Sequence, residues 1–400
     1  MPWYSSITRA QWNTLAAAQF GWMLDAMDVM LYAFALTAIR DEFRLSSAAA
    51  GAMASATLLA SAFGGVLFGI LADRIGRTRA LVWSILSYSA FTGLTATASG
   101  IATLLLWRAL VGIGLGGEWS AASVLVAETW PAEHRGKAIG LMQSGWAIGY
   151  ILAALVTAAI LPRWGWRPLF AVGVAPALLA AWILTNIPDS PLRPLARSPA
   201  LAAPTRLLIR RILLASSVTS SVLFAYWGLF TWIPTYLSSP IARGGAGMSV
   251  VASSAWIVPM QVGAFFGYTS FGFLADRFGR RPVFLTFVWS AAILAPVYGQ
   301  WGRHPAALMA MGPLVGFFGH GYFSVFGAML AELFPAAIRA TAQGLCYNVG
   351  RAISALAPFT IGALADRHGI GSALALTSVF FVAGGALIFL LPETRGEQLT

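Results

Sequence analysis

Charged side chains are scarce in this chain of 400 residues. Asp, Glu, Lys and Arg make up 10% of it, whereas 58% of the residues are hydrophobic and the mean hydropathy is +0.75. Soluble domains carry roughly 25% charged residues. So few charges could not cover the surface of a soluble protein of this length, but a surface facing lipid needs no polar coat. The composition therefore excludes a soluble domain and predicts a membrane protein.

Cysteine is almost absent, since Cys346 alone excludes an internal disulfide. No metal-ligand cluster and no nucleophile–base pair is visible in any loop, so we expect neither an enzyme nor a cofactor or metal site. No short apolar run with a small-residue cleavage site opens the chain, so we expect no removable signal peptide. The net charge of +11 would suggest nucleic acid in a soluble protein, but basic loops are what membrane topology requires, and we expect no nucleic-acid partner.

Long apolar runs are what the chain has in abundance. A helix needs about 20 apolar residues to cross the hydrocarbon core. Twelve such runs are present, near residues 12–39, 48–71, 80–98, 101–127, 138–161, 167–187, 208–237, 249–275, 283–300, 306–331, 341–364 and 372–391. We therefore predict an all-α membrane protein with twelve spans, surrounded by lipid and monomeric.

Basic residues divide unequally between the two sides of these spans. The side that holds both termini carries sixteen, namely Arg9, Arg74, Arg77, Arg79, Arg135, Lys137, Arg193, Arg197, Arg206, Arg210, Arg211, Arg277, Arg280, Arg281, Arg339 and Arg395. The other side carries seven, namely Arg40, Arg44, Arg163, Arg167, Arg243, Arg303 and Arg367. Because basic loops stay in the cytoplasm, we expect a plasma (inner) membrane protein with both termini cytoplasmic.

The chain contains an internal repeat. The stretch G-I-L-A-D-R-I-G-R at 69–77 recurs as G-F-L-A-D-R-F-G-R at 272–280, displaced by 203. Pro188-Asp189-Ser190 recurs as Pro392-Glu393-Thr394, displaced by 204. We therefore predict two six-span bundles, residues 1–190 and 208–400, joined by a cytoplasmic linker at 191–207. Such repeats suit alternating access, with a substrate site between the halves near mid-membrane.

The repeated motif resembles the signature of the major facilitator superfamily, as does the run from Arg108 through Gly112 to Gly117 in the fourth span. The resemblance covers the whole chain and implies that superfamily's fold and transport activity. The D-x-x-D of span 1 (Asp25, Asp28) and its preceding Gly-Trp resemble the sialate and lactate group of carboxylate:proton symporters. Other features resemble the aromatic-acid symporters and the sugar porters, although Ala26 departs from the former and span 7 lacks the glutamine-rich hexose motif.

Five ionisable residues lie inside the predicted spans: Asp25, Asp28, Arg108, Glu118 and Arg351. Each would cost roughly 2.5–3.5 kcal/mol facing lipid, so we expect them to line the interior or a cavity. A site with two fixed arginines favours an organic anion.

Asp25 and Asp28 share one helix face, and two carboxylates this close in a low-dielectric place do not both ionise easily. They are candidate proton-coupling residues together with Glu118, with Asp28, deeper in the span, preferred. The alternatives are that one aspartate only pairs with Arg108, and that Glu118 is a structural or gating partner.

Arg351 offers a planar fork suited to a carboxylate and is a candidate substrate anchor, or else an ion-pair partner of the span 1 aspartates. Arg108 could bind substrate or neutralise an aspartate. His320 is included among the candidate substrate residues, and is either a helix-contact residue or a titrating one. Polar and aromatic side chains complete the predicted pocket: Tyr32, Gln143, Trp146, Tyr150, Tyr226, Trp227, Tyr347 and Asn348.

Acidic and basic residues at the cytoplasmic ends of the spans have a different expected role. By resemblance they form latches between the halves, although simple anchoring by the arginines is the alternative. The predicted gating set is Asp73, Arg77, Glu128, Arg135, Asp276, Arg280, Glu332 and Arg339.

The chain is thus predicted to be a proton-coupled symporter of a small organic anion, a monocarboxylate or an acidic sugar. The first alternative is a carrier of aromatic acids or neutral sugars. A transporter-like membrane sensor is the second, which the short predicted loops disfavour.

Overall fold

A computed structural model describes residues 7–131, 135–187, 206–302, 304–334 and 339–394 of the chain. The regular structure in these ranges is helical. The first half of the chain forms α1 (Arg9–Phe43), α2 (Ser47–Ile75), α3 (Arg77–Thr95), α4 (Ile101–Thr129), α5 (Arg135–Trp164), α6 (Trp166–Ala171), η3 (Val172–Val174) and α7 (Pro176–Asn186). The second half forms α8 (Arg206–Phe230), α9 (Ile233–Ser238), η4 (Ile241–Arg243), α10 (Val250–Phe278), α11 (Arg280–Gln300), α12 (Pro305–Gly321), α13 (Ser324–Leu333), α14 (Arg339–Ser354), α15 (Leu356–His368), α16 (Ile370–Leu374) and α17 (Leu376–Ile388).

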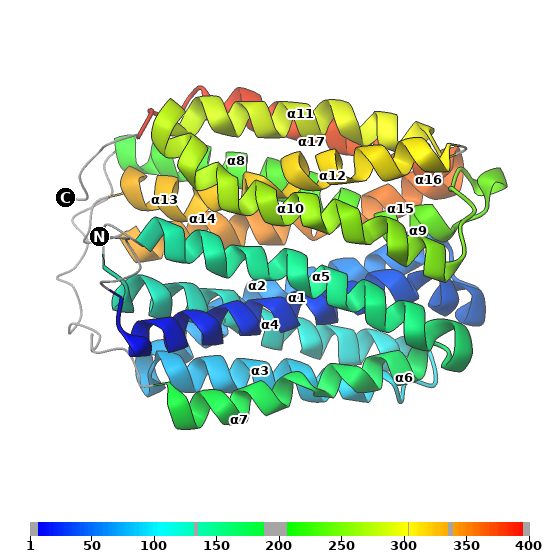
Figure 1. Ribbon diagram of the computed structural model, residues 1–400, viewed down its shortest axis with the longest axis horizontal. Coiled ribbons are helices and arrows are strands. Elements are labelled where there is room, and N and C mark those ends of the chain that lie inside the picture. Colours follow the sequence, from blue (N-terminus) through cyan, green and yellow to red (C-terminus); the bar gives the residue numbers. More distant parts are fainter. Residues whose placement is uncertain (1–6, 132–134, 188–205, 303, 335–338, 395–400) are drawn as a thin grey trace.

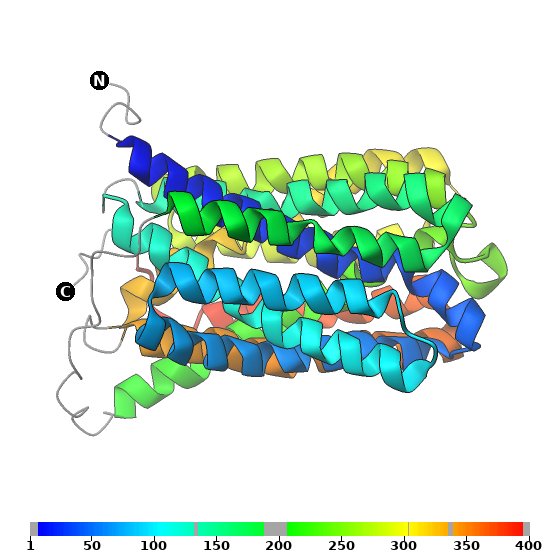
Figure 2. The ribbon, with the colours of Figure 1, turned by 90° about the horizontal axis from the view of Figure 1, so that it is seen from below.

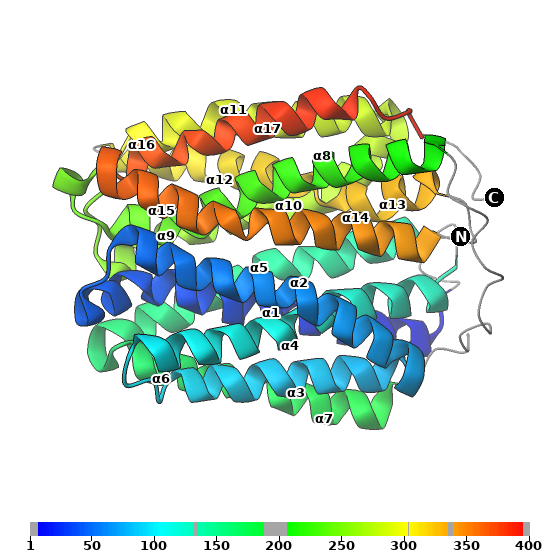
Figure 3. The same cartoon turned by 180° about the vertical axis from the view of Figure 1, so that it is seen from behind.

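The helices run roughly along one axis as two bundles that lie side by side (Figure 1). Helices α1 to α7 form one bundle and α8 to α17 the other, and the view from behind shows the same division (Figure 3). In the view from below, the first bundle lies in front of the second (Figure 2). The start of α1 and the end of α17 lie at the same end of the molecule, which we call the terminal end; the opposite one is the distal end.

The helices that the structure describes form twelve rods along the long axis once collinear helices are joined. Within the described ranges, ten stretches are long and apolar enough to span a membrane by length and composition. The other two rods are α3 and the joined pair α14–α15, which lie beside them and pack on α4 and α2 respectively. The predicted linker at 191–207 falls outside the described residues except for its last two, with which α8 begins.

Matching turns and caps show that the two halves are built alike. Gly76 and Gly279, 203 residues apart, take φ of 100° and 101°, and each joins two helices at the terminal end. Only glycine adopts such φ readily. Ser46 and Ser249, also 203 apart, cap α2 and α10 by accepting from the backbone N–H three residues on. The repeat seen in the sequence is therefore a repeat of local structure.

Five predicted spans are not continuous helices, and two of them, 167–187 and 372–391, are interrupted at η3 and between α16 and α17. The run 208–237 breaks between α8 and α9, 306–331 between α12 and α13, and 341–364 between α14 and α15. Proline accounts for the first break, because Pro234 has no N–H for the carbonyl of Phe230 four residues earlier. That carbonyl instead accepts from the hydroxyl of Tyr150 on α5, at 3.0 Å, so the interruption becomes a contact between the two bundles.

Candidate functional site

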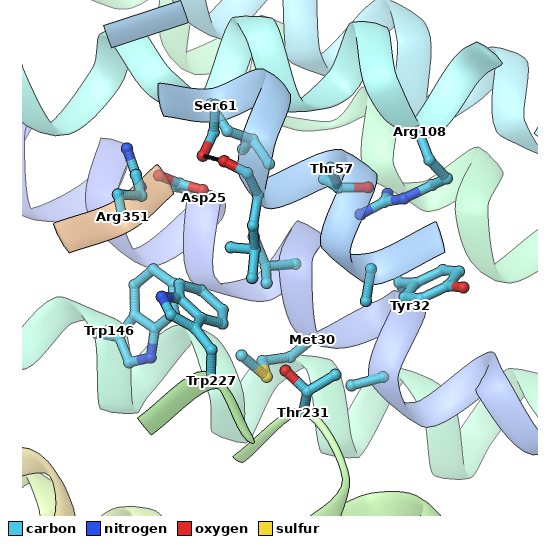
Figure 4. Close-up of a pocket in the computed structure, with 15 residues that line it drawn as sticks. Asp25, Met30, Tyr32, Thr57, Ser61, Arg108, Trp146, Trp227, Thr231 and Arg351 are labelled. Carbon is cyan, nitrogen blue, oxygen red and sulfur yellow. Dashed lines mark hydrogen bonds between the residues drawn. The ribbon is translucent and has the colours of Figure 1, made fainter. Parts of the chain in front are cut away.

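A small cavity lies between the two bundles, enclosed by side chains from α1, α2, α4, α5, α8 and α14 (Figure 4). Its volume is about 30 Å³, room for about two water molecules. The lining residues are Asp25, Val29, Met30, Tyr32, Ala33, Ala54, Thr57, Leu58, Ser61, Arg108, Leu115, Trp146, Trp227, Thr231 and Arg351. Asp25 and Arg351 lie together at one side of the cavity, whereas Arg108 and Tyr32 lie at the other (Figure 4).

Arg108 and Asp28 form the first charged group. Arg108 Nη1 lies 3.7 Å from Asp28 Oδ2, and the two side chains are 1% and 0% exposed. The hydroxyl of Thr92 on α3 donates to Asp28 Oδ1, and the Arg108 guanidinium lies over the Tyr32 ring, 4.9 Å from its centroid. Tyr32 in turn donates to the Ala50 carbonyl at 3.1 Å. Asp28 is therefore held by a cation and a hydroxyl, as expected for a buried carboxylate.

Asp25, Glu118 and Arg351 form the second charged group. Asp25 and Arg351 are the charged residues that act electrostatically on Glu118. All three side chains are buried. Asp25 Oδ2 and both carboxyl oxygens of Glu118 have no hydrogen-bond partner among the described residues. Glu118 packs against Gly21, one turn before Asp25, where any larger residue would overlap it. This group holds two acids and one cation, so its acids are less well neutralised than Asp28.

The predicted residues Gln143, Tyr347 and Asn348 surround the cavity rather than line it. The rings of Tyr347 on α14 and Trp119 on α4 stack at 4.2 Å, which joins the two bundles. Trp119 Nε1 donates to Gln143 Oε1 at 3.1 Å, and Arg351 lies 5.9 Å from the centroid of the Tyr347 ring. Asn348 packs against Gly65 of α2. These residues therefore support Arg351 and the contact between the bundles.

The predicted His320 and Tyr226 lie in an aromatic cluster behind the cavity wall. His320 is buried; its Nδ1 lies 3.1 Å from the Gly316 carbonyl, and its ring is 5.1 Å from that of Tyr226. Neither residue lines the cavity, whereas Trp227 does. The geometry matches the helix-contact interpretation of His320.

Two of the predicted gating residues pair with each other at the terminal end. Arg280 Nη2 lies 3.2 Å from Glu332 Oε1, and the Thr394 hydroxyl donates to Glu332 Oε2 at 2.6 Å. The Glu393 carboxylate accepts from the backbone N–H groups of Arg280 and Arg281, both at 2.9 Å. These contacts lie within the second bundle. The side chains of Asp73, Glu128, Arg135, Asp276 and Arg339 lie outside the described residues.

Sequence reasoning missed Thr92 altogether and did not single out Thr57, Ser61 or Thr231 in the cavity wall. Thr57 and Ser61 lie one turn apart in a predicted span, and that spacing of hydroxyls on one helix face was the available signal. Thr92 had none, because a lone threonine in an apolar helix commonly bonds to its own backbone. Only the packing of α3 against α4 and α7 brings it to Asp28.

Comparison with known proteins shows which family has this architecture. The family model of the major facilitator superfamily matches residues 20–270 and 241–400. A cis,cis-muconate transport protein of Acinetobacter baylyi is 34% identical, over 90% of each chain, and a sialic acid transporter of Escherichia coli is 27% identical, over 97% of this chain and 95% of its own. A proton:xylose symporter of solved structure superimposes with a TM-score of 0.75, at 19% identity over 97% of both chains. The predicted twelve-helix fold is thereby confirmed, and the chain is an integral membrane protein that belongs to the major facilitator superfamily of transporters.

Proposed function

We propose that this protein is a proton-coupled symporter of a small organic anion, a monocarboxylate or an acidic sugar, working by alternating access. The observation that carries the proposal is the cavity between the bundles, which the buried side chains of Arg108, Arg351 and Asp25 line together. Buried ionisable residues in a membrane protein mark substrate or proton pathways. The excess of basic residues on the side of both termini supports a cytoplasmic terminal end.

Formal charges explain why an anion and a proton would move together. The Arg108–Asp28 pair is neutral, whereas Asp25, Glu118 and Arg351 sum to −1 when all are ionised. A monoanion added alone would bring the second group to −2 in a low-dielectric place, which is costly. A monoanion added with one proton leaves it at −1. The charge balance therefore favours symport over the entry of an anion alone.

The two charged groups are proposed to have different roles. Asp28 is already held by Arg108 and Thr92, so it keeps Arg108 in position. Asp25 Oδ2 and both carboxyl oxygens of Glu118 have no hydrogen-bond partner among the described residues, and we assign the exchangeable proton to this pair rather than to Asp28. Arg351, which faces the cavity beside Asp25, would bind the substrate carboxylate. Its fork suits a carboxylate, and the neighbouring acids link its charge to the proton.

A second candidate substrate class is an aromatic or other planar acid. Trp146 and Trp227 both line the cavity, with ring centroids 5.9 Å apart, and both indole N–H groups are buried without an acceptor among the described residues. Such walls offer ring contacts and hydrogen-bond donors to a flat ligand. The muconate relative, which is named for an unsaturated acid, points the same way.

Transport by the purified protein in liposomes tests the proposal. Uptake of labelled carboxylates such as lactate, sialate, muconate and 4-hydroxybenzoate is measured with and without an inward proton gradient. We expect the gradient to drive uptake of one of these classes well above equilibrium. Proton coupling would be refuted if the gradient changed the uptake of none of these carboxylates under conditions where exchange is active.

Variants separate the anchor from the proton site. Arg351→Gln should lower substrate affinity at least tenfold, because it removes the charge-assisted bonds to the carboxylate. The matched control is Arg367→Gln, which removes an exposed arginine at the distal end and should leave affinity unchanged. Glu118→Gln should keep exchange of substrate across the membrane but lose accumulation driven by the gradient. If Asp28→Asn alone shows that pattern, the assignment of the proton to Asp25 and Glu118 is wrong.

A further inference from the structure

A third copy of the repeated motif lies at the opposite end of the molecule. Leu364-Ala365-Asp366-Arg367-His368-Gly369, preceded by Gly362, repeats the pattern of residues 69–76 at a displacement of 293. Gly369 also takes a positive φ, 80°, like Gly76. The first two copies end α2 and α10 at the terminal end, whereas this copy ends α15 at the distal end.

The carboxylate of Asp366 binds the first turn of α2, which belongs to the other bundle. Its Oδ1 accepts from the backbone N–H of Ser47 and its Oδ2 from that of Ala48, both at 2.9 Å. The next N–H, of Ala49, goes to the cap side chain of Ser46 at 3.1 Å. The first amides of a helix have no partner within it, and the partial positive charge there favours an anion. Asp366 thus completes the cap of a helix in the opposite half.

Close packing of α2 on α15 surrounds this contact. Gly51 of α2 lies against the carbonyl of Pro358, and Gly362 of α15 lies against the carbonyl of Ser47, so that a Cβ at either position would overlap backbone. Ser55 Oγ accepts from the backbone N–H of Phe359 at 3.2 Å. Nearby, Thr37 Oγ1 of α1 and Ser238 Oγ of α9 are 3.2 Å apart, again between the two bundles. The distal ends of the bundles are therefore joined.

Water can reach the Asp366 contact. A polar hollow of about 470 Å³ adjoins it, lined by Arg40, Ser47, Ser239, Arg243 and Asp366 among others. Asp366 is exposed, and Arg40 acts on it electrostatically from α1. When the bundles separate here, both the carboxylate and the two amides can be hydrated, so the contact can break and re-form without leaving buried groups unpaired.

Among the described residues, no corresponding side-chain contact to the first amides of α10 is seen in the other half. Ser249 caps α10 as Ser46 caps α2, and α10 packs on α5 as α2 packs on α14 and α15. At the position on α5 that corresponds to Asp366, 204 residues earlier, the chain has Pro162. That position on α5 therefore carries no carboxylate, and Asp366 distinguishes the α2–α15 pair from the α10–α5 pair.

We infer that Asp366 is the latch of a distal gate: its carboxylate, bound to the first amides of α2, holds the two bundles together at the distal end and is released when that end opens. The inference rests on the proposed alternating access, but its test needs no substrate, so it can fail independently of the transport proposal.

Disulfide cross-linking at the distal end measures the latch. Cysteines in place of Thr37 and Ser238, in a Cys346→Ala background, report closure, because their side chains meet only when the bundles are in contact. Asp366→Asn keeps the shape of the side chain but removes its charge and one acceptor. We expect it to slow oxidative cross-linking threefold to tenfold, in line with the interaction of an anion with a helix N-terminus. Asp366→Glu should restore much of the rate.

The matched control is Asp41→Asn, the same chemical change at an exposed acid of the same end. It should cross-link at the parent rate. Hydrogen exchange of residues 45–52 gives a second readout, since the amides of Ser47 and Ala48 should exchange faster in Asp366→Asn. A parent rate of cross-linking and unchanged exchange in Asp366→Asn would overturn the latch. Equal slowing in Asp41→Asn would also overturn it, because general surface charge would then be the cause.

Discussion

The buried pair of Arg108 and Asp28 makes the sharpest prediction on stability. Arg108→Gln removes the cation and leaves a carboxylate at 0% exposure with only the Thr92 hydroxyl to hold it. At the observed 3.7 Å the attraction of two unit charges is about 4.5 kcal/mol for an effective dielectric constant near 20. Removal of one partner from a buried pair typically costs about 3–5 kcal/mol. We expect Arg108→Gln to lower the free energy of unfolding by about that amount.

A double-mutant cycle turns this magnitude into a test. Asp28→Asn in the Arg108→Gln background removes the stranded charge, so the double variant should be more stable than Arg108→Gln by about 1–3 kcal/mol. The free energy of unfolding is measured in mixed SDS–detergent micelles, with tryptophan fluorescence as the signal. A double variant that is less stable than the single one would refute the claim that the pair is held by charge.

An exposed ion pair supplies the control for that experiment. Arg167 Nη2 lies 2.7 Å from Glu42 Oε1, a shorter distance than in the buried pair, but the two side chains are 42% and 39% exposed. Solvent screening should outweigh the shorter distance, so Arg167→Gln should lower the free energy of unfolding by less than about 1 kcal/mol. If the exposed pair proved to be the more costly one to break, burial would not be the deciding factor.

Two further predictions concern helix packing and pH. A Cβ at Gly316 would overlap the Met260 carbonyl, whereas one at Gly272 would meet nothing within 4 Å, so Gly316→Ala should cost about 1–3 kcal/mol and Gly272→Ala should be neutral or slightly stabilising in the same unfolding assay. Burial raises the pKa of Asp366, but the Ala48 and Ser47 amides and Arg40 outweigh it and hold that pKa below its ordinary value. Since the latched state has the lower pKa, the latch should be complete above the ordinary carboxyl range and weaken as pH falls through the lowered value. Thiol oxidation itself slows in acid in every variant, so Asp366→Asn supplies the reference rate at each pH. Relative to that reference, cross-linking between cysteines at 37 and 238 should slow in acid in the parent and in a His368→Gln control.

Much of the fold could be predicted because a membrane restricts the structures that can span it. Lipid demands apolar helices of a fixed length, so composition alone predicts the rods, and the duplicated motif predicts the two bundles. The helix breaks were not foreseen, because a proline such as Pro234 can sit inside a membrane helix when another group takes the freed carbonyl. Here that group is Tyr150, 84 residues earlier and in the other bundle, and no local pattern signals it.

The charged residues of the site could be predicted because charge in a span is costly and therefore conspicuous. The sequence singled out Asp25, Asp28, Arg108, Glu118 and Arg351, and the structure buries all five. The division into two groups was beyond sequence reasoning, since the spacing of Asp25 and Asp28 suggests one site. Neutral residues were predicted less well, since His320 was included among the substrate residues and yet lies outside the cavity. Asp366 was not considered because it lies beyond the predicted span 341–364, although α15 continues through it.

The smallness of the central cavity has a thermodynamic consequence for ligand binding. A space of about 30 Å³ has no room for an organic acid, so this cavity must widen before it can hold one. Any ligand must select a state in which the walls have moved apart, and its apparent dissociation constant is the intrinsic value divided by the population of that state. Changes far from the cavity that make the closed form less favourable should therefore tighten binding without adding a contact. The measured affinity would then depend on the population of the open state as well as on the contacts that the binding residues make.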